Sequence, residues 1–194
     1  TGDLGNNVIR GLAGADIING HDGDDTLIGG AGADQMTGGD GIDWADYSTA
    51  FAGVAANLAS GGTGGDAAGD TYNTIENLRG SDLADTLVGD SQNNVIDPGL
   101  SLFGTDQVNG AGGSDVLFLN YMRGDYGDGV IGGFTNWASG AGSFVRSAGA
   151  TPLDAVSFTS IEQLYAIGTI RDDVINAAAG DDTIYGLAGN DTLR

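Results

Sequence analysis

The most regular feature of the sequence is a nine-residue pattern of glycine, aspartate and apolar residues. Residues 11–46 form four consecutive copies, GLAGADIIN, GHDGDDTLI, GGAGADQMT and GGDGIDWAD. Each copy reads G-x-x-G-x-D and ends in three residues, the middle one apolar, and GDLGNNVIR before them has Asn7 in the aspartate place. A fixed short period predicts a solenoid whose coils stack on one another.

The last three residues of each repeat are too few for a helix and direct one side chain inward, which predicts a short strand. The glycines at the first and fourth places permit a tight turn before that strand. Two repeats, with one strand on each face, complete one coil. We therefore predict an all-β solenoid of short stacked strands whose inward side chains are Ile9, Ile18, Leu27, Met36 and Ala45.

Turns two repeats apart should stack at the strand spacing of ~4.8 Å. This brings Asn7, Asp25 and Asp43 into one column and Asp16 and Asp34 into the other. A bare ladder of carboxylates would repel itself, whereas a divalent cation between stacked turns would neutralise it. Carboxylate and carbonyl oxygens in a flexible cage suit Ca²⁺; Mg²⁺ retains its waters, and zinc or copper prefers His or Cys.

These repeats resemble the GGxGxDxUx nonapeptides of the RTX (repeats-in-toxin) family. The resemblance implies a right-handed parallel β-roll that binds several Ca²⁺ ions in its turns. The two stacked aspartates would be joined by carbonyls of places one and three of one turn and of places two and four of the other. The residues nominated are Gly11, Ala13 and Asp16 with Gly30, Gly32 and Asp34, and Gly20, Asp22, Gly23 and Asp25 with Gly39, Gly41 and Asp43.

Further along the chain the arrays alternate with interruptions in one continuous solenoid. We expect a first array at 1–46, an insertion returning through a degenerate coil at 47–79, a second array at 80–118, an aromatic-containing insertion at 119–167 and a third array at 168–194. Glu76 takes the aspartate place of the degenerate coil, either as a ligand or only to solvate the turn. The later arrays add the candidate ligands Asp85, Asn94, Asp106, Asp115, Gly168, Asp173, Asp182, Gly189 and Asp191. The second glycine is missing from several of these repeats, and Asp173 should stack with Asp191 while Asp182 faces a later coil.

Composition narrows the class of protein. The net charge is −21, from 27 acidic and 6 basic residues, which argues against nucleic acid and anionic membranes as partners. A solubilising or halophilic surface is the alternative explanation, but the aspartates lie at repeat positions. The 37 glycines are periodic, so they indicate turns rather than disorder, and the absence of cysteine excludes disulfides and thiolate metal sites. No apolar run approaches the ~20 residues needed to span a bilayer.

No catalytic constellation is visible, so we do not expect this chain to be an enzyme, although a parent protein could be one. The only histidine, His21, lies in a repeat turn. The second insertion carries Tyr121, Tyr126 and Trp137, which could present flat faces to a sugar or could instead fill the core.

We predict a calcium-binding RTX module that folds on meeting extracellular Ca²⁺ and supports type I secretion and stability of a larger bacterial protein. Because the chain begins and ends within repeats, we expect it to be a piece of that secreted or cell-surface protein. Its partners would be calcium, the rest of the parent protein and the type I secretion machinery. The alternative is a carbohydrate-binding accessory module of a polysaccharide-modifying enzyme or an adhesin.

Overall fold

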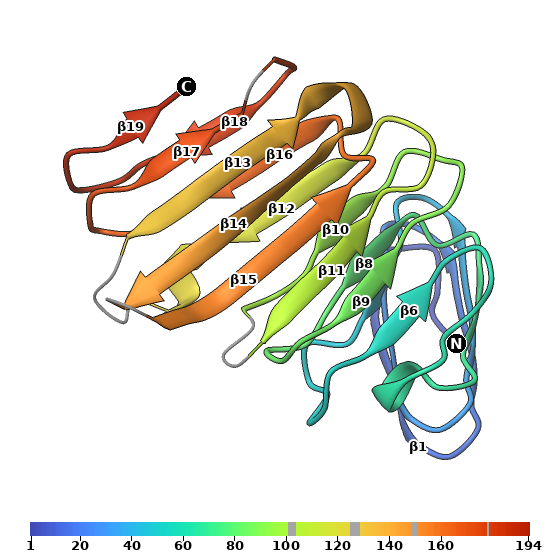
Figure 1. The fold of residues 1–194 in the computed structure, drawn as a ribbon. Helices are drawn as coiled ribbons and strands as arrows, with labels where there is room; N and C mark the ends of the chain where they lie inside the picture. Colours follow the sequence, from blue (N-terminus) through green and yellow to red (C-terminus); the bar gives the residue numbers. More distant parts are fainter. Residues whose placement is uncertain (101–103, 125–128, 149–150, 178) are drawn as a thin grey trace.

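The computed structural model describes residues 1–100, 104–124, 129–148, 151–177 and 179–194, and these form a two-layered roll of strands (Figure 1). One layer is a continuous eight-stranded sheet, called sheet A. In spatial order its strands are β1 (Val8–Ala13), β3 (Thr26–Ala31), β5 (Trp44–Asp46), β8 (Asn77–Arg79), β10 (Val95–Asp97), β12 (Val116–Asn120), β16 (Gln163–Ile167) and β18 (Thr183–Tyr185).

The opposite layer is divided into two sheets. The three-stranded sheet B consists of β2 (Ile17–Asp22), β4 (Gln35–Asp40) and β7 (Thr71–Asn73). The eight-stranded sheet C consists, in spatial order, of β19 (Thr192–Leu193), β17 (Val174–Asn176), β13 (Val130–Asn136), β14 (Ala141–Ala148), β15 (Thr151–Thr159), β11 (Thr105–Asn109), β9 (Thr86–Val88) and β6 (Ala55–Asn57). In the described part of the chain, 3-10 helices connect strands at Gly65–Ala67, Tyr121–Gly124 and Trp137–Ser139.

The register confirms the predicted coil of two repeats. In sheet A, Val8 pairs in parallel with Thr26, and in sheet B, Ile17 pairs with Gln35, so stacked residues are eighteen apart. The strands of the first coils are longer than the predicted three residues. They contain six, because pairing continues into the following turn, where Leu12 lies beside Gly30.

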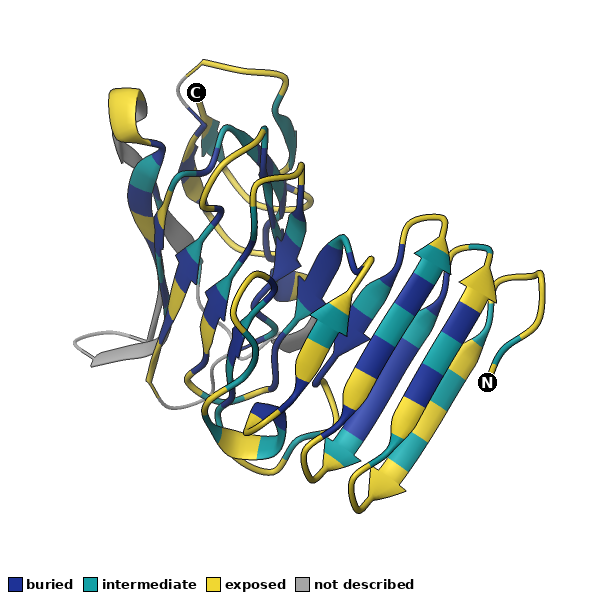
Figure 2. Cartoon of the chain, turned by 90° about the vertical axis from the view of Figure 1, so that its right-hand side faces the viewer, coloured by how far each residue is buried: buried dark blue, intermediate teal, exposed yellow. Residues whose placement is uncertain are grey.

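The core is a ladder of inward side chains, one from each strand. Along sheet A, paired strands place these residues directly over one another, and all are fully buried apart from the half-buried Ile9 at the start. The ladder runs through Ile9, Leu27, Ala45, Leu78, Ile96, Leu117 and Leu164. In Figure 2 the buried positions form dark bands that cross neighbouring strands.

The first interruption supplies two outer strands in one long coil. It leaves sheet A after β5, begins sheet C with β6, ends sheet B with β7 and returns to sheet A through β8. Val54, Ala56 and Leu58 are buried, as their alternation predicts. The break between sheets B and C therefore lies within this coil.

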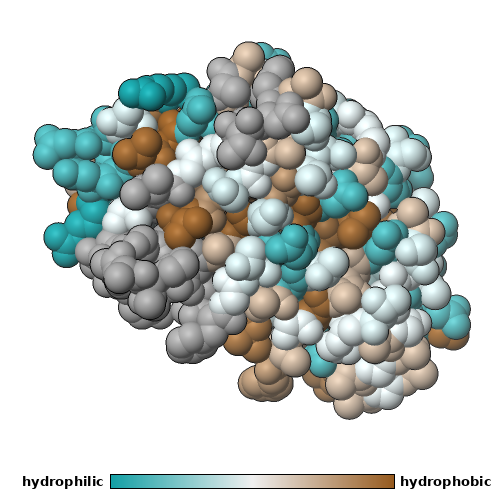
Figure 3. Space-filling model, in the orientation of Figure 1, coloured by the Kyte–Doolittle hydropathy of each residue, from teal (hydrophilic) through white to brown (hydrophobic). Residues whose placement is uncertain are grey.

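The second interruption is built into the wall of the roll. β15 pairs in parallel with β11, and β13 with β17, while β14 runs antiparallel between β13 and β15. Phe144 and Phe158 stack in the core with ring centroids 5.8 Å apart. The insertion thus keeps the two-layered section and reverses one strand, which the sequence pattern did not indicate. On the face drawn in Figure 3, apolar residues show through between hydrophilic ones.

Candidate metal centre

The sixth place of the repeat forms a column along the edge of sheet A. Each residue of this column directly precedes a strand, and the column consists of Asn7, Asp25, Asp43, Glu76, Asn94, Asp115, Glu162 and Asp182. Except at Asn94, which donates its Nδ2 to the carbonyl of Glu76, and at Asp182, a side-chain oxygen from one coil accepts the backbone N–H of the place-six residue one coil earlier. Asp25 Oδ1 accepts from Asn7 at 2.7 Å, and Asp43 Oδ1 accepts from Asp25 at 2.8 Å.

The second column follows sheets B and C with the same bonding. Asp34 Oδ1 accepts the N–H of Asp16 at 2.8 Å, and Asp70 Oδ1 accepts that of Asp34 at 2.8 Å. Asp106 Oδ1 accepts from Asp85 at 2.9 Å, and Asp191 Oδ1 accepts from Asp173 at 3.0 Å. The structure thus brings together the aspartates that the repeat period had placed in columns.

The sequence analysis did not predict that Asp70 and Glu162 belong to these columns, and it placed Asp182 against the wrong coil. Asp70 lies outside any complete repeat. Glu162 is the counterpart of Glu76, because their Oε2 atoms accept the N–H groups of Asp115 at 2.9 Å and Asp43 at 2.8 Å. The similar segments TYNTIENL and SFTSIEQL carried the signal for Glu162. Asp182 accepts the N–H of Leu164 at 2.9 Å, so it stacks on the preceding coil rather than only on a later one.

The second oxygen of several place-six carboxylates is buried without a hydrogen bond. Within the described part of the chain this holds for Oδ2 of Asp16, Asp25, Asp34, Asp43 and Asp115. Burying a polar oxygen without a partner is costly, more so when it carries charge. Burial raises the pKa of Asp34 and of Asp43, and it raises the pKa of Asp115 to about 6. Each of these oxygens therefore lacks a positive partner.

Carbonyl oxygens also lie between the stacked turns. From the earlier coil, the carbonyls of Leu12 and Gly14 point at Gly30 and Gly32, where a β-carbon on either glycine would overlap them. From the later coil, the carbonyl of Ala31 accepts the N–H of Gly14 at 2.9 Å. A glycine is needed at these places because the neighbouring backbone approaches so closely.

The carbonyl directions differ from the assignment that the resemblance implies, and which carbonyls bind an ion stays a prediction. That assignment took places one and three from the earlier coil, but carbonyl directions alternate along an extended segment, and here places two and four of the earlier coil point at the later one. The carbonyls between the first pair of stacked turns are those of Leu12, Gly14, Gly29 and Ala31, instead of Gly11, Ala13, Gly30 and Gly32. Those between the second pair are His21, Gly23, Gly38 and Asp40, instead of Gly20, Asp22, Gly39 and Gly41.

The first glycine of the repeat makes room for the carboxylate. A β-carbon on Gly11 would lie 2.6 Å from both Asp16 Oδ2 and the carbonyl oxygen of Gly29. Gly168 stands in the same relation to Asp173, whose oxygen a β-carbon there would overlap. Place one is thus a cradle that only glycine leaves open.

This donor set fits a hard cation. The oxygens are carboxylate and carbonyl, and His21 is exposed. The described residues contain no group of three or more His, Cys, Asp or Glu side chains suited to a metal, so carbonyls must supply much of any coordination shell. Flexible all-oxygen ligation is characteristic of Ca²⁺.

Three of the later candidates are bonded within their own turns. Asp85 accepts from Ser81, Asp173 accepts from Thr169, and Asn94 is paired with Asp90. Gly189 adopts a left-handed φ of 128° in the turn of Asp191, as the glycines of the first array do.

The aromatic candidates of the second insertion give no sugar-binding surface in the described residues. Tyr121 is only 2% exposed and belongs to the core. Tyr126 lies outside the described residues, and of Trp137 the structure describes the backbone but not the side chain. Burial of Tyr121 agrees with the interpretation that this ring fills the core.

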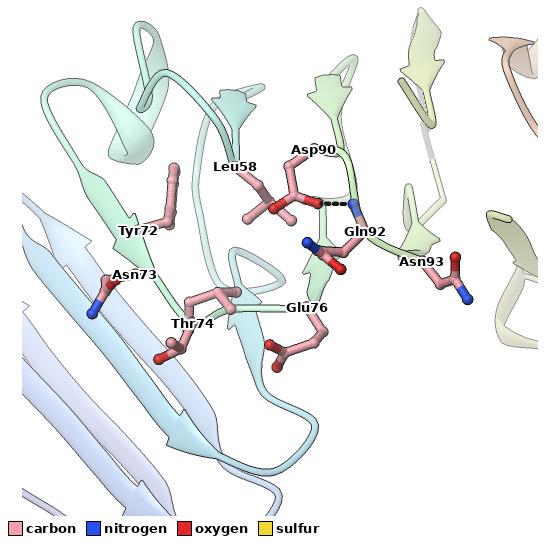
Figure 4. Close-up of a pocket in the computed structure, with 9 residues that line it drawn as sticks. Leu58, Tyr72, Asn73, Thr74, Glu76, Asp90, Gln92 and Asn93 are labelled. Atoms are coloured by element: carbon pink, nitrogen blue, oxygen red, sulfur yellow. Dashed lines mark hydrogen bonds between the residues drawn. The ribbon is translucent and has the colours of Figure 1, made fainter. Parts of the chain in front are cut away.

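A cavity of about 670 Å³ lies where sheet B ends and sheet C begins (Figure 4). Glu76 and Asp90 contribute its carboxylates. Glu76 already accepts the N–H of Asp43, and Asp90 accepts that of Gln92 at 2.8 Å. The acidic groups of this cavity therefore belong to the turns themselves. Among the described residues no helix is long and apolar enough to cross a membrane.

Comparison with known families identifies these turns. The chain matches the RTX calcium-binding nonapeptide repeat (4 copies) over residues 1–36, 17–45, 72–100, 102–119 and 167–194, which together exceed half of its length. No catalytic domain was identified, and no curated protein matches the chain. RTX repeats bind Ca²⁺ and are typical of secreted bacterial proteins. The chain therefore belongs to the RTX calcium-binding nonapeptide repeat family.

Proposed function

We propose that this module folds when it meets extracellular calcium and thereby supports type I secretion and stability of a larger bacterial protein. The observation that carries the proposal is the set of buried, unpaired Oδ2 atoms of Asp16, Asp25, Asp34, Asp43 and Asp115. Without a cation, the folded state must bury these charges unpaired or protonate them, whereas the unfolded chain leaves them in water.

Two places in the first array fit an ion best. The first would be held by Asp16 and Asp34 with the four carbonyls between their turns, and the second by Asp25 and Asp43 with theirs. A bound Ca²⁺ would supply the positive charge that these oxygens lack. Since the two coils of each pair are separate in the unfolded chain, binding and folding are linked.

Moderate affinity at each site is sufficient for such a switch. Extracellular calcium modules have dissociation constants of roughly 10⁻⁴ to 10⁻³ M. At a concentration tenfold above that constant, one site stabilises the folded state by about 1.4 kcal/mol. With several sites acting together, the chain would be unfolded in a calcium-poor cell and folded outside it. An unfolded chain suits passage through an export channel.

Far-UV circular dichroism tests this function. The chain is treated with EGTA and titrated with CaCl₂, and MgCl₂ serves as the control because Mg²⁺ does not accept so irregular a set of ligands. We expect a cooperative gain of β signal with calcium alone. Full β structure in EGTA would contradict folding on calcium and leave a constitutively folded scaffold.

The carbohydrate-binding alternative has less support. It required exposed aromatic faces in the second insertion, and Tyr121, one of its three candidates, is buried.

A further inference from the structure

Ten of the repeat turns fall into two conformations, and the degenerate turns of Glu76 and Glu162, with a positive φ at Thr74 and Ser160, belong to neither. In the first conformation, called open, the residue at place two has a positive φ and so does the glycine at place four. Leu12 (79°) with Gly14 (123°) and His21 (81°) with Gly23 (110°) are examples. A left-handed Leu or His costs about 1–2 kcal/mol, so its presence points to a functional constraint. The open turns are those of Asp16, Asp25, Asp34, Asp43, Asp115 and Asp191.

In the second conformation, called closed, place two bonds to place six of the same turn. The N–H of Ser81 donates to Asp85 Oδ2 at 2.7 Å, and its hydroxyl donates to Oδ1 at 2.8 Å. Thr169 makes the same two bonds to Asp173, at 2.8 Å and 3.1 Å. The carboxylates of closed turns are thus hydrogen-bonded within their own turn, whereas those of open turns have no such donor.

The turn of Asn94 is closed by an amide. Asn94 Oδ1 accepts the N–H of Asp90 at 2.8 Å, and its Nδ2 donates to Asp90 Oδ1 at 3.3 Å and to the carbonyl of Glu76 at 2.8 Å. Figure 4 shows Asp90 beside Gln92, whose N–H it accepts at 2.8 Å. Asp3 and Asn7 repeat this pairing at the start of the chain, at 2.6 Å and 3.1 Å.

Two places in the sequence separate the classes. Closed turns have Ser, Thr or Asp at place two, and three of them have Leu83, Gln92 or Arg171 where open turns have the left-handed glycine at place four. None of these three residues has a positive φ. Without the left-handed turn, the N–H of place two faces place six and closes the turn.

We propose that the closed turns of Asp85, Asn94 and Asp173 contribute no place-six ligand to calcium, because the place-two donor takes the position of the ion. This refines the function proposed above and rests on it. Stacked pairs in which both turns are open occur, among the described residues, only at Asp16 with Asp34 and at Asp25 with Asp43. Calcium dependence is then concentrated in the first array, while a closed turn restarts the roll after each interruption.

Matched Asp→Asn variants test this inference. Asn keeps an oxygen for the backbone N–H from the preceding coil and removes the charge. The number of Ca²⁺ ions bound per chain is measured by equilibrium dialysis on variants whose circular dichroism in calcium equals the wild type. We expect Asp34→Asn to lose at least one ion and both Asp85→Asn and Asp173→Asn to retain the wild-type number.

The outcomes distinguish the two proposals. A wild-type chain that binds no calcium would refute the proposed function, whereas equal losses in Asp34→Asn and Asp85→Asn would overturn the inference alone. If the closed-turn Asn variants do not fold, Ser81→Ala decides, because it leaves the carboxylate intact. The ion number should not fall in that variant; a loss would make the hydroxyl a ligand and overturn the inference.

Discussion

In the first array, Leu12 and His21 hold strained left-handed backbones beside carboxylates that have an unpaired oxygen. In the second array, Ser81 and Asp90 occupy the same place of the repeat, without a positive φ, and hydrogen-bond to the side chain at place six. Both arrays stack two repeats in each coil and share one inward ladder, although stacked aspartates are 18 residues apart in the first array and 21 apart in the second. The difference teaches that one repeat position can provide either carboxylate oxygens without a donor or a self-contained turn, depending on whether the backbone at place two is left-handed or directs its N–H to place six.

The largest expected effect is that of chelation. In EGTA, residues 1–46 should become accessible to protease before residues 80–118, because the open turns lose their cations while the closed turns keep their hydrogen bonds. Limited proteolysis with mapping of the first cleavage sites measures this. Earlier cleavage within the second array would break the comparison.

Leu78→Ala should lower the stability of both arrays equally. Leu78 is fully buried in the ladder between β5 and β10, and removing such a side chain costs about 2–5 kcal/mol. Thermal unfolding in saturating calcium measures the loss. The calcium concentration at the folding midpoint should rise only as far as this loss of stability accounts for. A larger rise would show that the ladder also shapes the ion sites.

Asp25→Ala should cost about 1–3 kcal/mol in calcium, because it removes the acceptor for Asn7 N–H and one carboxylate of an ion cage. It should also raise the calcium concentration at the folding midpoint severalfold. Asp85→Ala is the matched control in a closed turn: it should lower stability and raise the calcium midpoint by no more than that loss of stability accounts for, whereas the shift in Asp25→Ala should exceed its loss of stability. The same shift of midpoint in both variants would remove the distinction.

In EGTA, the metal-free fold should gain stability as the pH falls from 7 to 5. The folded-state pKa of Asp115, about 6, exceeds the unfolded value near 3.9, so the folded state binds the proton more tightly. This contribution is complete below the unfolded pKa and is lost as the pH rises through 6. Because we expect the chain to be largely unfolded in EGTA, the far-UV β signal is the readout: the folding equilibrium should shift toward the folded state by on the order of 1 kcal/mol. A weaker β signal at pH 5 than at pH 7 would contradict this.

Leu12→Gly should stabilise the calcium-loaded module by less than about 1 kcal/mol. It relieves a left-handed φ at an exposed side chain, against the backbone entropy that glycine adds to the unfolded chain. Leu83→Gly in the closed turn, where φ is not positive, should have the opposite sign. Thermal midpoints of both variants make the comparison.

The period of nine was sufficient to predict the coil, the inward residues and the aspartate columns. Those features follow from the alternation of side chains and the fixed rise between coils, which Leu27 and Asp25 illustrate. The antiparallel strand β14 was not predictable in this way, since the insertion has no repeat and its pairing depends on tertiary contact.

The finer chemistry of the site depended on backbone direction. Which carbonyls face an ion space is set by the φ angles of Leu12 and Gly14, and a residue pattern does not give their sign or the order of the coils. Asp70 was missed because it belongs to an irregular loop. The closing role of Ser81 lies in the sequence, but it becomes visible only once its hydrogen bonds to Asp85 are known.

Hydrogen–deuterium exchange of the wild-type chain, resolved along the sequence in calcium and in EGTA, tests the central claim most directly. The amides of β1 to β4 should lose protection first and most on chelation, and those around the turn of Asp85 should lose it last. Equal loss in both arrays at every time point would contradict the division into calcium-dependent and self-contained turns.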